Sequence, residues 1–211
     1  NIYSYFLNNG MWPRGYPLEE VVQRDSFELL PSEPVPVGAW QGMSDNEPDV
    51  DAIYRLTVSY GRIKFEEKPP VVMGKHNYCP FNSQNTMWDQ SAFPYLYLPC
   101  TTSFRFTDIL RGYVAQRLFW QEDLYLGFTG ATVYQNRNKH NLMKDFADEI
   151  ECYLHVPQVV ELLEALELSD DPLENIVDVY QVLSDHDLVK SKEVDLAGAW
   201  VRDVKRLTQR S

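Results

Sequence analysis

The sequence predicts an α/β domain followed by a helical extension, and three observations lead to this prediction. Strand-like runs and helical spacing are mixed over residues 1–156, as in an α/β domain. From residue 157 onward the spacing is helical throughout. Hydrophobic residues make up 44% of the 211-residue chain, which is enough to form a core and argues against global disorder. We therefore expect a domain over 1–156 and a helical C-terminal extension over 157–211.

The first part contains short runs that are separated by turns. Residues 31–40, PSEPVPVGAW, predict an extended, Pro-rich connector. Residues 50–60, VDAIYRLTVSY, are rich in β-branched and aromatic residues and predict a strand. A further short strand is predicted within 66–73, after the pair Pro69-Pro70, and another within 94–102, where Pro99 ends it. The Asn- and Gln-rich residues 78–93 predict an irregular loop between these two strands.

Residues 106–120 predict a helix. Four side chains recur on one face at helical spacing, namely Ile109, Tyr113, Gln116 and Trp120. Thr107 or Asp108 is expected to cap its start. Gly112 within this segment costs about 1 kcal/mol relative to Ala, which suggests that another backbone approaches closely there.

The remaining chain predicts four helices. The first, from residue 141, places an apolar stripe on one face, formed by Leu142, Phe146, Ile150 and Tyr153. Pro157 is expected to end this helix and to begin the next. Asp171 can cap a third helix with Pro172 at its first position, and residues 192–207 predict the fourth.

The formal net charge of −12 argues against sequence-independent binding to nucleic acid through phosphates. The charge is unevenly distributed. Residues 146–211 contain six basic and 15 acidic residues, whereas residues 1–145 contain 13 and 16. The acidic part therefore predicts a solvated helical face, and the first part is still able to form a local cationic pocket.

The three cysteines do not form a CxxC pair, so the sequence does not support a zinc site or a thioredoxin-like motif. It has no apolar run near the roughly 18 residues of a membrane span. The chain begins with Asn1 in what resembles the middle of a domain, so we expect a fragment. A membrane anchor is expected only upstream of this chain.

Arg14 lies in the rigid, aromatic-flanked loop WPRGYP. Its guanidinium can donate two parallel hydrogen bonds to a phosphate or carboxylate, and the adjacent Gly15 allows the backbone to approach a ligand. The alternative is a surface arginine in a tight turn.

Asp49 and Asp51 form an acidic pair with one residue between them. In an extended segment both carboxylates would point to one side, where they could share Mg²⁺ or Mn²⁺ or contact a sugar. The alternative is an exposed turn.

Four further residues are candidates. Asp108 is either a helix cap or a general base, and Arg111 lies one turn beyond it as a possible substrate contact. Asn82 and Gln84, in FNSQNT, are suited to hydrogen bonds with sugar hydroxyls or belong to a plain connector. His140 is either a metal or phosphate ligand or a solvated loop residue. A Ser-His-Asp order, a P-loop and GxGxxG are all missing, so hydrolase and dinucleotide-binding functions have no support.

Five stretches in this order resemble the STELLO-type glycosyltransferases over roughly residues 10–155. They read WPRGYPLEEV, PDVDAIYRLT, PFNSQNTMW, FRFTDILRGYVAQ and TVYQNRNKHNLMKDFADEIECY. More distantly, the chain is similar to the reversibly glycosylated polypeptides, the UDP-arabinopyranose mutases. This resemblance implies the acceptor-side part of a GT-A-like glycosyltransferase domain over 1–156, with a nucleotide-binding half upstream.

The resemblance also implies roles for particular residues. Arg14 matches the arginine that is reversibly glycosylated in the mutases, and Asp49 and Asp51 match the acidic pair of their PDxDA block. Asp108 matches the second aspartate of a further acidic pair, but Thr107 stands where the first would be. The complete acidic set of the mutases is therefore not reproduced, and mutase activity is not expected.

The resemblance implies transfer from a UDP-sugar to a carbohydrate or glycoconjugate acceptor, with a divalent metal, Mn²⁺ or Mg²⁺. It places the protein in the Golgi membrane with this domain in the lumen, where a membrane glycan synthase is a possible partner; a cytoplasmic location is the alternative. Two other functions stay open. One is a non-catalytic scaffold that assists a membrane polysaccharide synthase, and the other is a carbohydrate-binding module.

Overall fold

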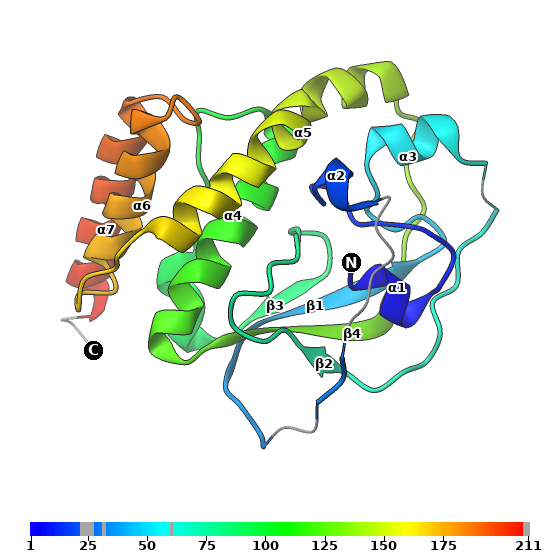
Figure 1. Cartoon of the computed structure of the whole chain (residues 1–211), viewed down its shortest axis with the longest axis horizontal. Helices are drawn as coiled ribbons and strands as arrows, with labels where there is room; N and C mark the ends of the chain where they lie inside the picture. Colours follow the sequence, from blue (N-terminus) through cyan, green and yellow to red (C-terminus); the bar gives the residue numbers. More distant parts are fainter. Residues whose placement is uncertain (22–27, 31–32, 60, 209–211) are drawn as a thin grey trace.

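The computed structural model describes residues 1–21, 28–30, 33–59 and 61–208. It confirms the predicted α/β class. Figure 1 shows a small sheet with the long helices α4 and α5 on one side of it and the pair α6 and α7 beside α4. The N-terminal segment and α3 lie near the opposite end of the sheet from α6 and α7.

The sheet contains four strands in the order β2-β4-β1-β3. Its centre is the parallel pair β1 (Val37–Asp45) and β4 (Tyr125–Tyr134), and the short strands β2 (Val71–Val72) and β3 (Thr86–Trp88) flank it in antiparallel orientation. Parallel pairing requires a long crossover, which here contains α3 and α4. Because β1 and β4 run in the same direction, their carboxyl ends meet at one edge of the sheet.

The helices account for most of the remaining structure. Two single turns lie near the N-terminus, α1 (Tyr3–Phe6) and α2 (Leu18–Val21), and α3 covers Ala52–Thr57. The 3₁₀ segments are η1 (Gln90–Leu96) and η2 (Trp120–Glu122). The long helices are α4 (Phe104–Phe119), α5 (Leu142–Ala165), α6 (Glu174–Asp185) and α7 (Lys192–Thr208).

Two predicted strands are wrong. Within residues 50–60, Ala52–Thr57 form the helix α3 instead of a strand, and the Asp51 carboxylate caps this helix by accepting a 2.7 Å hydrogen bond from the Tyr54 amide. Residues 94–102 form the end of η1 and a loop instead of a strand. The predicted connector over 31–40 already enters β1 at Val37. Residues 31, 32 and 60, which belong to these predictions, lie outside the described residues.

The helix predicted over 106–120 is confirmed as α4, and one of its details is also confirmed. A Cβ atom placed on Gly112 would lie 2.8 Å from the carbonyl oxygen of Phe81, so another backbone does approach closely there. The predicted cap is wrong, because the helix begins one turn earlier. Ser103 is the N-cap residue, and both Thr107 and Asp108 lie inside the helix.

The long helix α5 differs from its prediction in two ways. It continues through Pro157, which therefore does not end it, and the boundary placed between residues 156 and 157 falls within this helix. It also buries a different face, since Ile150 of the predicted stripe is exposed. The buried positions are Asp145, Glu149, Cys152, Val156, Val159 and Leu163.

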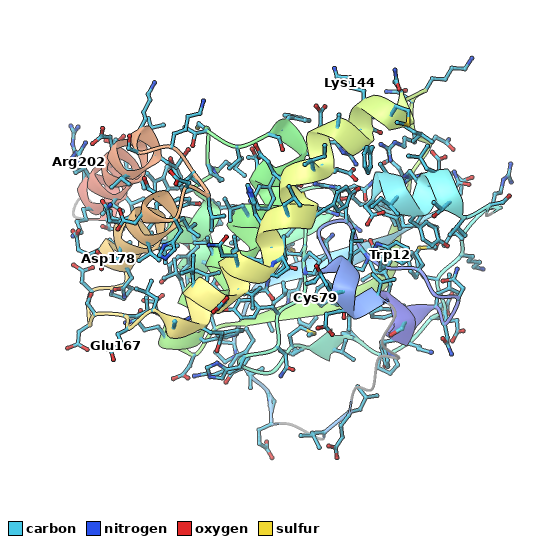
Figure 2. The ribbon with its side chains drawn as sticks, turned by 45° about the horizontal axis from the view of Figure 1, so that its top comes forward. Trp12, Cys79, Lys144, Glu167, Asp178 and Arg202 are labelled. Carbon is cyan, nitrogen blue, oxygen red and sulfur yellow. The ribbon has the colours of Figure 1, made fainter. Side chains whose placement is uncertain are left out.

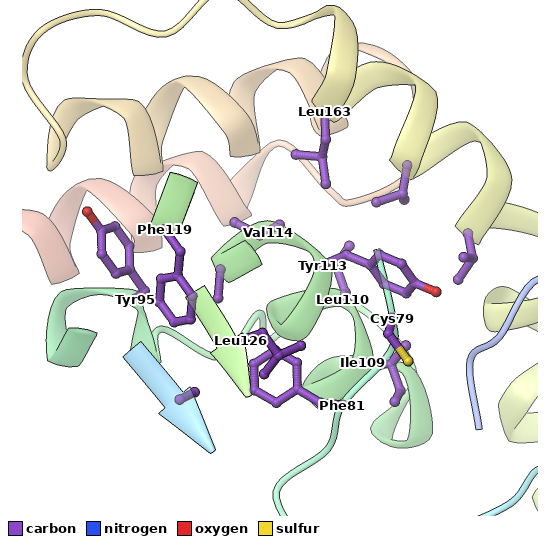
Figure 3. Packing of buried hydrophobic residues seen from close by; sticks show 14 of the residues in the cluster. Cys79, Phe81, Tyr95, Ile109, Leu110, Tyr113, Val114, Phe119, Leu126 and Leu163 are labelled. Carbon is purple, nitrogen blue, oxygen red and sulfur yellow. The ribbon is translucent and has the colours of Figure 1, made fainter. Parts of the chain in front are cut away.

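The core lies between the sheet and α4, and Figure 3 shows it from close by. Phe81, Phe119 and Leu126 come from a loop, a helix and a strand and pack together there. Helices α6 and α7 attach to this core through apolar side chains and through Glu193, which is fully buried at the start of α7. Within the described part of the chain, no helix combines the length and the apolar character that crossing a bilayer requires.

Candidate functional site around Arg14

The sequence-predicted residues gather near the carboxyl ends of β1 and β4. The chain leaves β1 at Asp45 and reaches Asp49 four residues later, and it leaves β4 at Tyr134 and reaches Arg137. The two exits are joined, because the Asn46 side-chain amide donates a 2.9 Å hydrogen bond to the Gln135 carbonyl oxygen. In open α/β sheets, ligands bind outside the carboxyl ends of the strands. The fold therefore places these residues at the edge where a ligand site is expected.

Arg14 joins three segments that are distant in the sequence. Its Nη2 lies 2.9 Å from a carboxylate oxygen of Asp49 and 3.1 Å from one of Asp108, and its Nε lies 3.1 Å from both oxygens of Asp49. Its Nη1 also donates to Asp108 at 3.1 Å and to the Arg105 carbonyl oxygen. The Arg14 side chain is only 8% exposed, so it is not the surface arginine that was the alternative prediction.

The contacts between Arg14 and its carboxylate partners determine the protonation states of Arg14 and Asp49. Burial alone would lower the pKa of Arg14, but Asp49 and Asp108 outweigh it and raise that pKa well above its usual range. Burial likewise acts to raise the pKa of Asp49, but Arg14 holds that pKa below its usual range. Arg14 therefore stays protonated and Asp49 stays ionised at neutral pH.

The predicted loop Asn82–Gln84 adds neutral donors to the same site. Asn82 donates a 2.7 Å hydrogen bond to Asp49 through its side-chain amide, and the Ser83 backbone amide donates one of 3.1 Å to Asp108. Gln84 reaches the site indirectly, since its backbone amide bonds to the Asn82 side chain at 2.8 Å. Gln84 itself is exposed. We call Arg14, Asp49, Asn82, Ser83 and Asp108 the Arg14 cluster.

Arg111 lies next to the Arg14 cluster but is buried beneath it. Its guanidinium lies 4.9 Å from the ring centre of Trp88 and 5.6 Å from that of Phe81, and its Nη2 donates a 3.0 Å hydrogen bond to the Ser83 hydroxyl. Burial lowers the pKa of Arg111. These contacts suit a cation that supports the Asn82–Gln84 loop from below.

Asp51 does not share a ligand with Asp49. One of its oxygens caps α3, and the other accepts a 2.5 Å hydrogen bond from the Trp12 indole, which Figure 2 labels close to α3. Burial raises the pKa of Asp51 to about 6. Asp51 is fully buried, so the alternative of an exposed turn is wrong at this position as well.

His140 belongs to a second group of charges at the start of α5. Its Nδ1 lies 3.2 Å from a carboxylate oxygen of Asp145, and Arg137 forms an ion pair of 2.7 Å with the same carboxylate. The Arg137 side chain also lies 3.2 Å from the His140 ring nitrogen. His140 thus faces a carboxylate and a guanidinium, and no hydrogen bond or ion pair joins it to Asp49 or Asp51.

The residues predicted to hold a divalent metal do not form one set of ligands. The carboxylate of Asp49 accepts from Arg14 and Asn82, and that of Asp51 accepts from Trp12 and Tyr54. Over the described ranges, no group of three or more His, Cys, Asp or Glu residues is arranged to hold a metal ion. Asp49, Asp51 and His140 therefore do not fit a shared Mn²⁺ or Mg²⁺ in this arrangement.

Sequence reasoning missed two residues that support the site. Glu149 on α5 is fully buried and accepts hydrogen bonds from the Ala52 amide at 2.7 Å and from Tyr153 at 2.5 Å. Arg105 pairs with Glu149 at 2.5 Å, while its carbonyl oxygen accepts from Arg14. The available signal was the spacing of Asp145, Glu149, Cys152 and Val156, which puts carboxylates on the face that α5 buries.

Comparison with known proteins identifies the family. The family model described as STELLO glycosyltransferases matches residues 105–210. The chain belongs to the STELLO glycosyltransferase family. It is 31% identical to "Probable glycosyltransferase STELLO2" of Arabidopsis thaliana and 29% identical to "Probable glycosyltransferase STELLO1" of the same plant, in both cases over 97% of this chain.

These alignments cover only 27% of each Arabidopsis protein, so the chain spans about a quarter of the length of the curated relatives it matches. The stretch matched by the STELLO family model contains Asp108 and Arg111, whereas Arg14 and Asp49 precede it. The Arg14 cluster thus joins the matched stretch to the preceding segments. The alignments to the two Arabidopsis STELLO proteins cover nearly the whole chain.

Proposed function

We propose that this chain forms the acceptor-side part of a GT-A-like glycosyltransferase that uses a UDP-sugar, with Asp108 as the base that receives the proton of the acceptor hydroxyl. The observation that carries the proposal is the setting of Asp108. Its carboxylate is fixed by Arg14 and by the Ser83 amide, yet 19% of its side chain remains exposed beside the exposed residues Ser83 and Gln84. A fixed carboxylate with an accessible edge suits proton abstraction from a bound hydroxyl.

Arg14 has a positioning role in this proposal. Its Nε and both terminal nitrogens donate to protein oxygens, so glycosyl attachment to Arg14 would require these contacts to break. The guanidinium instead sets the orientation of Asp49 and Asp108 relative to each other. The exposed side-chain amide of Gln84 provides hydrogen-bonding groups for sugar hydroxyls at the same edge. The buried Asn82 side chain instead bonds to Asp49 and to the Gln84 backbone amide, so it supports this loop.

The family membership supports the remaining parts of the proposal. Glycosyl transfer needs a sugar donor and a carbohydrate or glycoconjugate acceptor. A UDP-sugar as donor, a location in the Golgi lumen and a membrane glycan synthase as partner extend the resemblance described above. We expect any requirement for Mn²⁺ or Mg²⁺ to be met by ligands other than the set of Asp49, Asp51 and His140, and we assign no step to a metal.

The test uses the full-length protein that contains this chain. Release of UDP is measured with a panel of UDP-sugars and glycan acceptors, for the native protein and for Asp108→Asn. Loss of a general base lowers the turnover rate by about 10²- to 10⁴-fold. We expect a loss in this range for Asp108→Asn, with little change in the KM for the UDP-sugar.

Asp178→Asn is the matched control, because Asp178 is an exposed carboxylate on the outer part of α6 (Figure 2). This variant should retain native turnover. Thermal unfolding of both variants separates a catalytic loss from a loss of structure. Native turnover by a folded Asp108→Asn protein would overturn the role of Asp108, and no turnover by the native protein with any donor would support the non-catalytic scaffold instead.

A further inference from the structure

A second feature of the chain is an open cavity of about 890 Å³ on the other side of the Pro13–Pro17 loop from the Arg14 cluster. The N-terminal segment, the segment from β2 to Tyr78 and α5 line it together. The lining includes the side chains of Tyr16, Glu19, Glu20, Val72, Asn77 and Tyr78. Its volume lies in the range of natural sites for small molecules, which is about 300–1,000 Å³.

The Pro13–Pro17 loop separates the cavity from the Arg14 cluster. Arg14 extends to one side of this loop, toward Asp49 and Asp108, whereas Tyr16 lines the cavity. Gly15 between them has a φ of +83°, and its carbonyl oxygen accepts a 2.9 Å hydrogen bond from Tyr113, which also lines the cavity. The two sites are thus direct neighbours on one short loop.

The described side-chain charges of the cavity disfavour an anionic ligand. Its described lining contains Glu19, Glu20 and Glu28 together with His76, and it contains no Lys or Arg. Asn1 also lines the cavity, and its amino group donates a 3.1 Å hydrogen bond to the Tyr16 hydroxyl. Nucleotides and sugar phosphates are bound through cationic groups or helix N-termini that contact their phosphates. A lining with three carboxylates in a protein of net charge −12 therefore repels a nucleotide-sugar.

The remaining chemistry of the lining suits an uncharged ligand with hydroxyl groups. Tyr16 and Tyr78 are half-buried aromatic residues that can contact the apolar face of a sugar ring, next to the wall formed by Val71 and Val72. The carboxylates accept hydrogen bonds from hydroxyl groups, and the Asn77 amide both donates and accepts them. Aromatic walls with a few convergent polar groups are the usual composition of such sites.

We propose that this cavity binds the uncharged glycan acceptor. The role of the bound glycan as an acceptor rests on the proposed function, whereas the binding of a glycan does not. A transferase needs one place for its anionic donor and another for its acceptor. The negative charge of this cavity disfavours the anionic donor, whereas its aromatic and polar lining suits the acceptor. The short loop between Arg14 and Tyr16 would then place the bound glycan next to the carboxylates of the Arg14 cluster.

The test is a calorimetric titration of the 211-residue chain with neutral tetrasaccharides of glucose, mannose, galactose and xylose. UDP-glucose and tetramethylammonium serve as the anionic and the cationic probe. Val72→Trp fills the cavity from an edge strand, and Glu19→Gln with Glu20→Gln removes two of its carboxylates. We expect at least one neutral glycan to bind, with a loss of at least tenfold in each of these two variants.

Val133→Trp is the matched control, because Val133 is an exposed strand valine, like Val72, but does not line the cavity. It should bind the glycan as the native chain does, and thermal unfolding checks that all variants fold. The proposal is overturned if no neutral glycan binds, if Val72→Trp binds normally, or if only tetramethylammonium or UDP-glucose binds. Glycan binding by the native chain without transfer by the full-length protein would reject the proposed function alone, and transfer without binding here would reject this site alone.

Discussion

At the scale of single residues, the Arg14 cluster shows how a buried charge is made acceptable. One guanidinium is shared by two carboxylates, and the neutral amides of Asn82 and Ser83 donate further hydrogen bonds to carboxylate oxygens that Arg14 also contacts. Such a pair adds little to stability compared with apolar packing, but removing one partner leaves uncompensated charge in the interior. The two predictions at this scale follow from that asymmetry and from the burial of Asp51.

Arg14→Ala should lower the free energy of unfolding by about 3–5 kcal/mol, because it leaves Asp49 and Asp108 facing each other without a cation. Urea-induced unfolding measures this loss. Arg202→Ala removes an exposed arginine at the outer side of α7 (Figure 2) and should cost less than about 0.5 kcal/mol. Equal losses in the two variants would show that the buried ion pairs do not determine the effect.

Asp51 should make stability depend on pH. Its pKa rises on folding to about 6, so the folded chain binds a proton more tightly than the unfolded chain does. Its contribution is therefore complete in acid and is lost as the pH rises from about 4 to about 6, by on the order of 3 kcal/mol. In Asp51→Asn this contribution is absent, so the gap between native and variant stability should narrow from pH 4.5 to pH 7. Unfolding titrations at both pH values measure the gap, and a constant gap would contradict the raised pKa.

At the scale of elements, the sequence could predict those helices whose periodicity and capping agree with their packing. The α4, α6 and α7 helices were predicted from their periodicity, although the cap predicted for α4 was wrong. The helix within residues 50–60 was not predicted, because their β-branched and aromatic composition favours a strand. The Asp51 carboxylate, which caps α3, stabilises a helix there instead. The buried face of α5 was missed because it carries the carboxylates of Asp145 and Glu149, which a search for apolar stripes passes over.

Gly112→Ala tests the close contact between α4 and the chain at Phe81. Alanine gains about 1 kcal/mol in helix propensity, but its Cβ would lie 2.8 Å from a backbone oxygen, and overpacking of this kind costs about 1–3 kcal/mol. We expect a net loss of stability, measured by thermal unfolding. Gly198→Ala in α7 is the matched control, since its Cβ would meet only a flexible arginine end at 3.4 Å. It should stabilise the chain by up to about 1 kcal/mol, and the same sign in both variants would contradict the argument.

At the scale of the whole molecule, one buried carboxylate attaches the C-terminal helices to the rest. Glu193 at the start of α7 accepts hydrogen bonds from the Tyr97 hydroxyl and from the amides of Cys100 and Thr101, in the loop that leads into α4. This loop precedes Asp108 by less than ten residues. The helical extension therefore holds the segment that positions one residue of the Arg14 cluster.

Glu193→Ala should destabilise the chain by about 3 kcal/mol, because it leaves the buried Tyr97 hydroxyl and the part-buried amides of Cys100 and Thr101 without their acceptor. Hydrogen exchange should show faster opening of α6 and α7 and of residues 97–103. Asp195→Ala removes an exposed carboxylate from the same first turn of α7, so it loses the same favourable interaction with the helix dipole. Similar exchange in the two variants would show that Glu193 does not hold these segments together.

The candidate site was predictable only in part, and the reason lies in the length scale of its contacts. Residue type and local sequence were enough to select Arg14, Asp49 and Asp108. The sequence did not predict that they pair with one another, because Arg14 lies 35 positions from Asp49 and 94 positions from Asp108. The same holds for Glu149, whose partner Ala52 lies 97 positions away. Asp49 and Asp51 diverge for a local reason, the cap of α3, which the strand prediction concealed.

The distance along the chain between Arg14 and Asp108 also has a consequence for synthesis. The 94 residues that separate them take about 5–20 s to translate, at roughly 5–20 residues per second. During that time the guanidinium of Arg14 has emerged without one of its two carboxylate partners, so it remains hydrated. The loop that contains Arg14 therefore acquires its final place only after α4 has been made, and the candidate site cannot be completed before Asp108 has been translated.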